Sequence, residues 1–186
     1  MQGTIRIIAG KWRGRKLKVL DQTDLRPTPD RVRETLFNWL NPMIEGAYCL
    51  DLFAGSGALG FEALSRGAAF VVMVDQSPQV VQSLEASCKQ FGAENVLVYQ
   101  AKAPEQLRTS QQPFDIVFLD PPYQDNLLLP CCFYLEKAGL LADLAYIYLE
   151  ADHPIEQNEL PNHWQLIKSK QAGQVVFHLV KREKLT

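Results

Sequence analysis

The sequence predicts an α/β fold in which one doubly wound, mostly parallel sheet carries helices on both faces. From residue 47 onward, short continuous apolar segments alternate with amphipathic ones, a pattern typical of parallel strands buried on both faces. A glycine-rich turn joins the first of these strands to the next helix, as in many α/β sheets that bind ligands. The length of 186 residues corresponds to one domain over residues 1–186, with residues 1–40 as a basic extension.

The extension is predicted to begin with a β-hairpin and to end with a helix. Ile5–Ala9 and Leu17–Leu20 flank a glycine-rich connection, which favours a hairpin. A helix is expected to begin at Thr28-Pro29-Asp30, with Thr28 as the N-cap and proline at the first position. Asn41-Pro42 is expected to end it. Its apolar residues recur at helical spacing and are Val32, Leu36, Trp39 and Leu40.

Strands and helices are expected to alternate through the rest of the chain. The apolar segments predicted to be strands are Tyr48–Phe53, Phe70–Val74, Val96–Tyr99, Phe114–Leu119 and Leu144–Leu149. The helices between them are predicted at Ala58–Arg66, Pro78–Phe91 and Asn126–Lys137. The C-terminal segments Trp164–Ser169 and Gln174–Lys181 are expected to pair as an antiparallel hairpin around Ala172-Gly173.

Positive charge is concentrated near the N-terminus. Residues 1–33 carry nine basic and three acidic side chains, although the whole chain has a net charge of −2. A cationic segment on an acidic body favours an anionic partner such as nucleic acid, and an aromatic ring among the cations can stack on a base. Arg31 and Arg33 lie outside the apolar helix face and are expected to join this basic surface. The predicted RNA-contacting residues are Arg6, Lys11, Trp12, Arg13, Arg15, Lys16, Arg26, Arg31 and Arg33.

Membrane, secreted and metal-dependent classes are not expected. No apolar run reaches the roughly 20 residues that a membrane-spanning helix needs, and the N-terminus lacks the apolar core of a secretion signal. A cytoplasmic protein without a membrane partner is therefore predicted. The four cysteines and three histidines lack the spacing of metal sites, so neither a metal nor a disulfide framework is expected.

A glycine loop predicts a nucleotide-like ligand. Gly55, Gly57 and Gly60 form the pattern GxGxxG between a predicted strand and a predicted helix. Glycine permits the tight turn there and lets the backbone approach a ligand closely. Asp51 can face a ligand ammonium group, and Asp75 ends the next strand, where a carboxylate can accept hydrogen bonds from ribose hydroxyls. The loop alone fits either a dinucleotide or S-adenosylmethionine.

A second motif follows a buried strand. Phe114–Leu119 leads directly into Asp120-Pro121-Pro122-Tyr123. Two successive prolines restrict the backbone and make the loop stiff. This loop lies at the carboxyl end of a predicted central strand, which is where open α/β sheets bind their ligands.

Together the two motifs resemble S-adenosylmethionine-dependent methyltransferases that modify exocyclic amines. The N-terminal segments extend the resemblance to one family, the bacterial RsmD-type 16S ribosomal RNA (guanine-N2)-methyltransferases. The resemblance covers almost the whole chain, and the segments that carry it are Arg6–Leu17, Leu25–Thr28, Asp30–Leu40, Asp51–Gly60, Ala63–Gly67, Asp120–Tyr123 and Ala172–Val175.

This resemblance implies a Rossmann-like methyltransferase fold, S-adenosylmethionine as cofactor, S-adenosylhomocysteine as product and no metal. It also implies a monomer that acts on 16S ribosomal RNA, within a partly or fully assembled 30S subunit. Related enzymes usually place Asp or Asn before a small residue to bind adenine, whereas this chain has Lys102-Ala103, so only Ala103 is expected at the adenine. The residues expected to hold the cofactor are Asp51, Phe53, Gly55, Ser56, Gly57, Asp75 and Ala103.

The resemblance also implies roles for the second motif. The Asp120 carboxylate and the Pro121 carbonyl are expected to accept the two N–H groups of the target amine, which directs its lone pair toward the methyl donor. Tyr123 is expected to stack on the extruded guanine, and Pro122 completes the predicted catalytic segment.

Three alternatives share parts of this pattern. A DNA adenine-N6 methyltransferase uses the same second motif, but such enzymes usually carry a separate target-recognition segment. A nicotinamide-dependent oxidoreductase shares the glycine pattern, but no candidate hydride-transfer partner is evident. A non-catalytic RNA-binding assembly factor would keep the pocket without the reaction, because fold alone does not determine function.

Overall fold

A computed structural model describes residues 3–20, 28–108, 110 and 112–184. The strands are β1 (Thr4–Arg6), β2 (Lys16–Lys18), β3 (Tyr48–Asp51), β4 (Phe70–Asp75), β5 (Val96–Gln100), β6 (Phe114–Leu119), β7 (Leu141–Ala151), β8 (Trp164–Ala172) and β9 (Val175–Glu183). The helices are α1 (Asp30–Leu40), α2 (Ala58–Ser65), α3 (Pro78–Phe91) and α4 (Leu128–Lys137), with short 3-10 turns at Tyr123–Asp125 and Gln157–Glu159.

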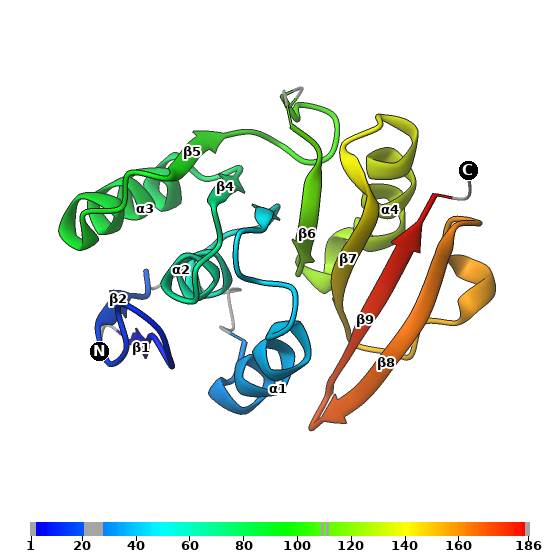
Figure 1. Cartoon of the computed structure of the whole chain (residues 1–186), viewed down its shortest axis with the longest axis horizontal. Helices are drawn as coiled ribbons and strands as arrows, with labels where there is room; N and C mark the ends of the chain where they lie inside the picture. The colour runs from blue at the N-terminus through cyan, green and yellow to red at the C-terminus, as the bar shows by residue number, and fades with distance from the viewer. Residues whose placement is uncertain (1–2, 21–27, 109, 111, 185–186) are drawn as a thin grey trace.

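Seven strands form the central sheet in the order β5-β4-β3-β6-β7-β9-β8 (Figure 1). Strands β3 to β7 are parallel, and β9 and β8 extend the sheet in antiparallel fashion. The chain proceeds outward from β3 through β4 to β5, and then returns to the other side of β3 as β6 and β7. The predicted doubly wound α/β fold with an antiparallel C-terminal hairpin is therefore confirmed.

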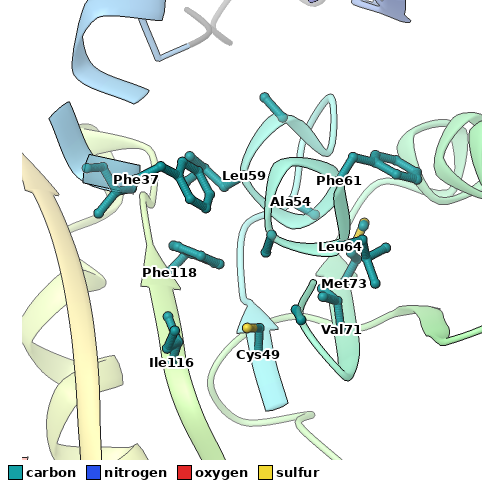
Figure 2. Close-up of a cluster of buried hydrophobic side chains, with 14 of the residues drawn as sticks. Phe37, Cys49, Ala54, Leu59, Phe61, Leu64, Val71, Met73, Ile116 and Phe118 are labelled. Carbon is teal, nitrogen blue, oxygen red and sulfur yellow. The ribbon is translucent and has the colours of Figure 1, made fainter. Parts of the chain in front are cut away.

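Two apolar layers cover the two faces of the sheet. On one face, α1, α2 and α3 pack on alternate strand residues that include Cys49, Met73 and Phe118 (Figure 2). On the other face, α4 packs on the intervening residues, such as Leu50 and Val117. The alternation arises because successive side chains of a strand point to opposite faces. Both faces of the sheet are covered by packed apolar side chains, which explains why the strands do not alternate between apolar and polar residues.

The N-terminal hairpin forms a separate two-stranded sheet that contacts α2. Strands β1 and β2 pair in antiparallel register, with Ile5 opposite Leu17. The Glu62 carboxylate accepts hydrogen bonds from the amides of Ile8 and Ala9 at 2.8 and 3.0 Å. Ser65, one turn further along α2, donates to the Ala9 carbonyl and accepts from the Trp12 amide. The hairpin is therefore anchored to the helix that follows the glycine loop.

The predictions that Trp12 and Arg33 contact RNA are wrong, because both side chains are buried where the hairpin packs against the helices. Trp12 is buried, and its ring packs against Phe61 and Phe91 at centroid distances of 6.3 and 5.2 Å. Arg33 is fully buried and donates to Asp30 and to the carbonyl of Arg6. A buried cation needs such partners, and the Arg33 guanidinium supplies a tie between α1 and the hairpin.

Several element boundaries differ from the predictions. Strand β3 ends at Asp51 rather than Phe53, and α4 begins at Leu128, after the 3-10 turn, rather than at Asn126. Strand β7 is longer than predicted and extends to Ala151. Thr28 is not the cap of α1: Pro29 occupies that position, and the Thr28 hydroxyl contacts two carboxyl groups instead.

The described residues contain neither a disulfide bond nor a helix suited to a membrane. All four cysteines are buried and free. Within the described ranges, no helix has the length and apolar character required to cross a bilayer.

Gly10 lies where the hairpin backbone packs directly against Ser65 at the end of α2. Its φ is +80°, and a Cβ built on it would lie 1.8 Å from the carbonyl oxygen of Ser65. Gly14 has nearly the same φ, +79°, but a Cβ there would meet nothing within 4 Å. A substitution at Gly14 therefore carries only the conformational cost of a positive φ, whereas one at Gly10 also carries the steric cost of a clash with α2.

We expect Gly10→Ala to destabilise the protein clearly more than Gly14→Ala. Both substitutions carry the backbone cost of a positive φ, about 1–2 kcal/mol, but only the first also displaces the hairpin from α2. Urea denaturation followed by circular dichroism measures the difference between the two variants. Equal free energies of unfolding would show that the hairpin does not depend on this close approach.

Candidate active site

A cleft lies at the carboxyl ends of β3, β4 and β6. It has two neighbouring parts, both lined by Phe53 and Asp120. The first part is further lined by residues that include Gly55, Ser56, Asp51 and Thr28. The second is further lined by residues that include Asp75, Ala103, Pro122 and Tyr123. The cleft coincides with the point where the strand order reverses between β3 and β6, the usual ligand-binding position in doubly wound sheets.

The glycine loop connects β3 to α2 along one wall of this cleft. Gly57 has a φ of +76°, and a Cβ there would lie 2.7 Å from atoms of both Leu84 and Phe61. Only glycine therefore fits the turn as it stands. Asp51 accepts a hydrogen bond from the Gly60 amide at 3.0 Å. Its burial raises the pKa of this carboxyl to about 7.

Asp75 braces the loop from the adjacent strand. One carboxylate oxygen accepts from the Gly55 amide at 3.0 Å, and the other accepts from the Ser77 amide at 2.9 Å. The same carboxylate lines the second part of the cleft. Ala103 lies in that part as well, whereas the neighbouring Lys102 is exposed and its amide donates to Gln106.

The Asp120–Tyr123 segment forms the opposite wall. Pro121 is buried and Pro122 is half-buried, while Tyr123 begins a 3-10 turn and is 40% exposed. The Tyr123 hydroxyl donates to Glu150 at 3.3 Å. The pKa of Asp120 is raised well above its ordinary value, first by burial and second by the nearby Glu150 carboxylate.

Glu150 is a site residue that sequence reasoning missed. It is 3% exposed, and it accepts hydrogen bonds from the hydroxyls of Tyr148, Thr28 and Tyr123. Burial is the main cause of its raised pKa. The sequence offered one signal: a single acid at the end of an apolar strand, beside the predicted ligand-binding edge of the sheet.

The predicted RNA-contacting residues fall into four groups. Arg15 is half-buried, donates to the Gln90 carbonyl at 2.6 Å and lies 4.3 Å from the centre of the Phe91 ring, so it helps to attach the hairpin to α3. Trp12 and Arg33 are buried, as described above, and Arg26 lies outside the described residues. The remaining predicted residues are exposed and are Arg6, Lys11, Arg13, Lys16 and Arg31.

The charges of the cleft restrict the ligands that it can hold. Its described walls carry four carboxyl groups, Asp51, Asp75, Asp120 and Asp125, against one basic side chain, Lys18. Such a site disfavours a pyrophosphate and favours a ligand with cationic and hydroxyl groups. Among the residues that the structure describes, no group of three or more His, Cys, Asp or Glu side chains is arranged to hold a metal ion.

Comparisons with known proteins agree with this architecture. The sequence profile of a family described as "Conserved hypothetical protein 95" matches residues 5–181. A protein named "Ribosomal RNA small subunit methyltransferase D" from Escherichia coli K12 is 49% identical over 181 residues, which cover 97% of this chain and 91% of the relative. Its namesake from Haemophilus influenzae is 45% identical over 184 residues, which cover 96% and 94%.

A solved structure gives the same result for the fold. The structure described as "Putative methyltransferase yhhF" from Escherichia coli has a TM-score of 0.90 and 48% sequence identity. The match covers 98% of this chain and 100% of that chain. The chain therefore has the Rossmann-like fold of methyltransferases.

Because the pKa of Asp120 is raised in the folded protein, the contribution of this residue to the free energy of unfolding depends on pH. The folded state retains the Asp120 proton above the pH at which the unfolded chain loses it, so stability falls as pH rises through the folded pKa. We expect Asp120→Asn to raise the melting temperature at pH 8 by at least about 2 °C, corresponding to about 1 kcal/mol for a domain of this size. The gain should shrink toward pH 5. Scanning calorimetry of both proteins at the two pH values measures it, and a gain that grew on acidification would contradict the assignment.

Proposed function

The chain belongs to the Conserved hypothetical protein 95 family, that of the ribosomal RNA small subunit methyltransferase D proteins, and on that premise we propose that it is an S-adenosylmethionine-dependent ribosomal RNA methyltransferase. The proposed target is the exocyclic N2 amine of a guanine in 16S ribosomal RNA. The observation that carries the proposal is the convergence of the glycine loop and the Asp120–Tyr123 segment on one cleft. Methyl transfer requires this convergence, because donor and acceptor must approach in line.

The residues of the cleft fit S-adenosylmethionine better than a dinucleotide. The bound cofactor would supply an activated methyl group on a cationic sulfur. In our proposal, Gly55, Ser56 and Gly57 hold its methionine end, with Asp51 and Phe53 beside them. Asp75 accepts hydrogen bonds from the ribose, and Ala103 lies against the adenine. Asp75 already accepts hydrogen bonds from the amide of Gly55 in the glycine loop and from the amide of Ser77, so its carboxylate is held in a fixed orientation for the ribose.

The target amine is proposed to lie between Asp120 and Pro121. Guanine N2 is a poor nucleophile because its lone pair is delocalised into the ring. Hydrogen bonds from its two N–H groups to the Asp120 carboxylate and the Pro121 carbonyl localise that lone pair and stabilise the positive charge that develops on nitrogen. Tyr123, which is partly exposed at the mouth of the cleft, is proposed to stack on the base. Pro122 keeps this segment stiff.

The exposed hairpin residues are proposed to contact the phosphates of 16S ribosomal RNA. The candidates are Arg6, Lys11, Arg13, Lys16 and Arg31, whose side chains are exposed. The anchorage of the hairpin to α2 would keep this surface fixed relative to the cleft. We propose a monomer that acts on RNA in a partly or fully assembled 30S subunit.

Asp120→Ala should abolish most methylation while cofactor binding persists. We expect a fall of at least about 100-fold in turnover, the scale of removing one group that stabilises developing charge. Methyl transfer to small-subunit RNA is measured by nucleoside mass spectrometry, which identifies N2-methylguanosine, and cofactor affinity by calorimetry. Asp143→Asn, an exposed acid on β7, is the control and should behave like the parent.

Two outcomes of this experiment would redirect the proposal. Methylation of duplex DNA at adenine N6, with no methyl group on ribosomal RNA, would indicate a DNA methyltransferase. Cofactor binding by the parent without any methyl transfer would indicate a non-catalytic RNA-binding factor.

Removal of the exposed hairpin charges should weaken RNA binding. Each phosphate contact contributes to the dependence of affinity on salt concentration, so replacing Arg6, Arg13 and Lys16 together with Gln should lower affinity and flatten the salt slope. The matched control replaces Lys168, Lys170 and Lys184, which are exposed in the C-terminal part of the chain, and removes the same charge. Filter binding across a salt series compares the two. Equal slopes in both triple variants would remove the hairpin from the RNA interface.

A further inference from the structure

Glu150 contacts Tyr123, which the proposed reaction uses, and is joined to Asp120 through Thr28. It lies one residue before the end of β7 and is 3% exposed. One carboxylate oxygen, Oε1, lies 3.3 Å from the Tyr123 hydroxyl. The other, Oε2, lies 2.7 Å from the Tyr148 hydroxyl and 3.2 Å from the Thr28 hydroxyl.

Thr28 joins Glu150 to Asp120. The same hydroxyl oxygen lies 3.1 Å from Asp120 Oδ2 and 3.2 Å from Glu150 Oε2. A hydroxyl carries one hydrogen, and an ionised carboxylate carries none. A full hydrogen bond to each group, rather than one hydrogen shared between two acceptors, requires that one carboxyl is protonated and donates to the Thr28 oxygen. Two buried carboxylates at this spacing also repel each other strongly, which favours retention of one proton.

The groups around the two carboxyls determine which of them holds the proton in the resting protein. Glu150 receives two tyrosine hydroxyls that Asp120 lacks, and hydrogen-bond donors stabilise the ionised form of a carboxyl group. Among the described residues, Asp51 is a further ionisable group near this pair, Lys18 lines the same part of the cleft as Asp120, and Asp152 lies near Tyr123. Strand β9 presents the apolar Phe177 opposite Glu150. In the resting protein, the shared proton therefore belongs mainly to Asp120.

We propose that Glu150 is a positioning residue that takes up this proton when Asp120 accepts the target amine, and that it fixes the Tyr123 ring. This inference rests on the proposed function. The O–H bond of Asp120 breaks as its proton passes to the Thr28 oxygen, and the original Thr28 hydrogen passes to Glu150 Oε2. Thr28 is unchanged overall, Glu150 becomes neutral and Asp120 becomes ionised. A cationic ligand in the cleft beside Asp120 drives the exchange, because it favours negative charge there.

The pH dependence of kcat/KM for RNA methylation tests this exchange, since kcat/KM reports ionisations of the free enzyme. The exchange keeps one proton on the pair, so the fall in kcat/KM of the parent at acidic pH reports uptake of a second proton, by Glu150. In Glu150→Gln the ionisation of Asp120 alone sets this acidic limb. Because Asp120 lacks the two tyrosine donors of Glu150, the limb should move to higher pH by at least about 0.5 unit. Asp152→Asn, which removes an exposed acid two residues further on, should leave the limb in place. A limb that stayed fixed in Glu150→Gln, with only a lower rate, would overturn the proposal.

Thr28 supplies a second test. Thr28→Ser keeps the hydroxyl and should retain activity within about threefold of the parent, whereas Thr28→Val keeps the shape and should lower kcat at least tenfold. Equal loss in both variants would contradict transfer through the hydroxyl. Infrared difference spectra of the resting proteins at neutral pH provide a readout without activity: beyond the contribution of Asp51, which both proteins share, the parent should show a protonated carboxyl band that Glu150→Gln lacks. If the parent fails to methylate RNA, the proposed function fails; if the parent methylates but the band or the limb shift is missing, only the inference about Glu150 fails.

Discussion

The pairing of β3 with β6 is the constraint on which the candidate site depends. The two strands run parallel, with Asp51 opposite Phe118, so the loops that follow them leave the same edge of the sheet. The glycine loop and the Asp120–Tyr123 segment are far apart in the sequence, and this register brings them to opposite walls of one cleft. A shift of the register by one residue would turn the side chains of the shifted strand to the opposite faces of the sheet.

Helix α2 connects the glycine loop to the N-terminal hairpin. The helix begins at the glycine loop, while Glu62 and Ser65 on its body bind the hairpin backbone. The proposed cofactor loop and the proposed RNA-binding surface therefore share one rigid element. Buried Arg33 adds a tie from α1 to the same hairpin. Because Arg33 anchors the hairpin, its charge does not contribute to the basic surface.

Much of this fold was predictable from the sequence, whereas the use of individual polar residues was not. Continuous apolar strands separated by amphipathic helices indicated the doubly wound sheet, and both loops were found at its carboxyl edge as predicted. Trp12 and Arg33 were assigned to the surface because local spacing contains no information about what the hairpin packs against. Glu150 was missed because its importance comes from Thr28 and Tyr123, which reach it from distant parts of the chain. Such contacts depend on the register of strands rather than on any local pattern.

The central claim is that one cleft brings the methyl donor and the target amine together between the two loops. A crystal structure of the complex with S-adenosylhomocysteine tests it most directly. We expect adenine beside Ala103, ribose hydroxyls on Asp75, and the sulfur atom directed into the space between the glycine loop and Asp120. A cofactor bound outside this cleft, or one whose sulfur faces away from Asp120, would contradict the account.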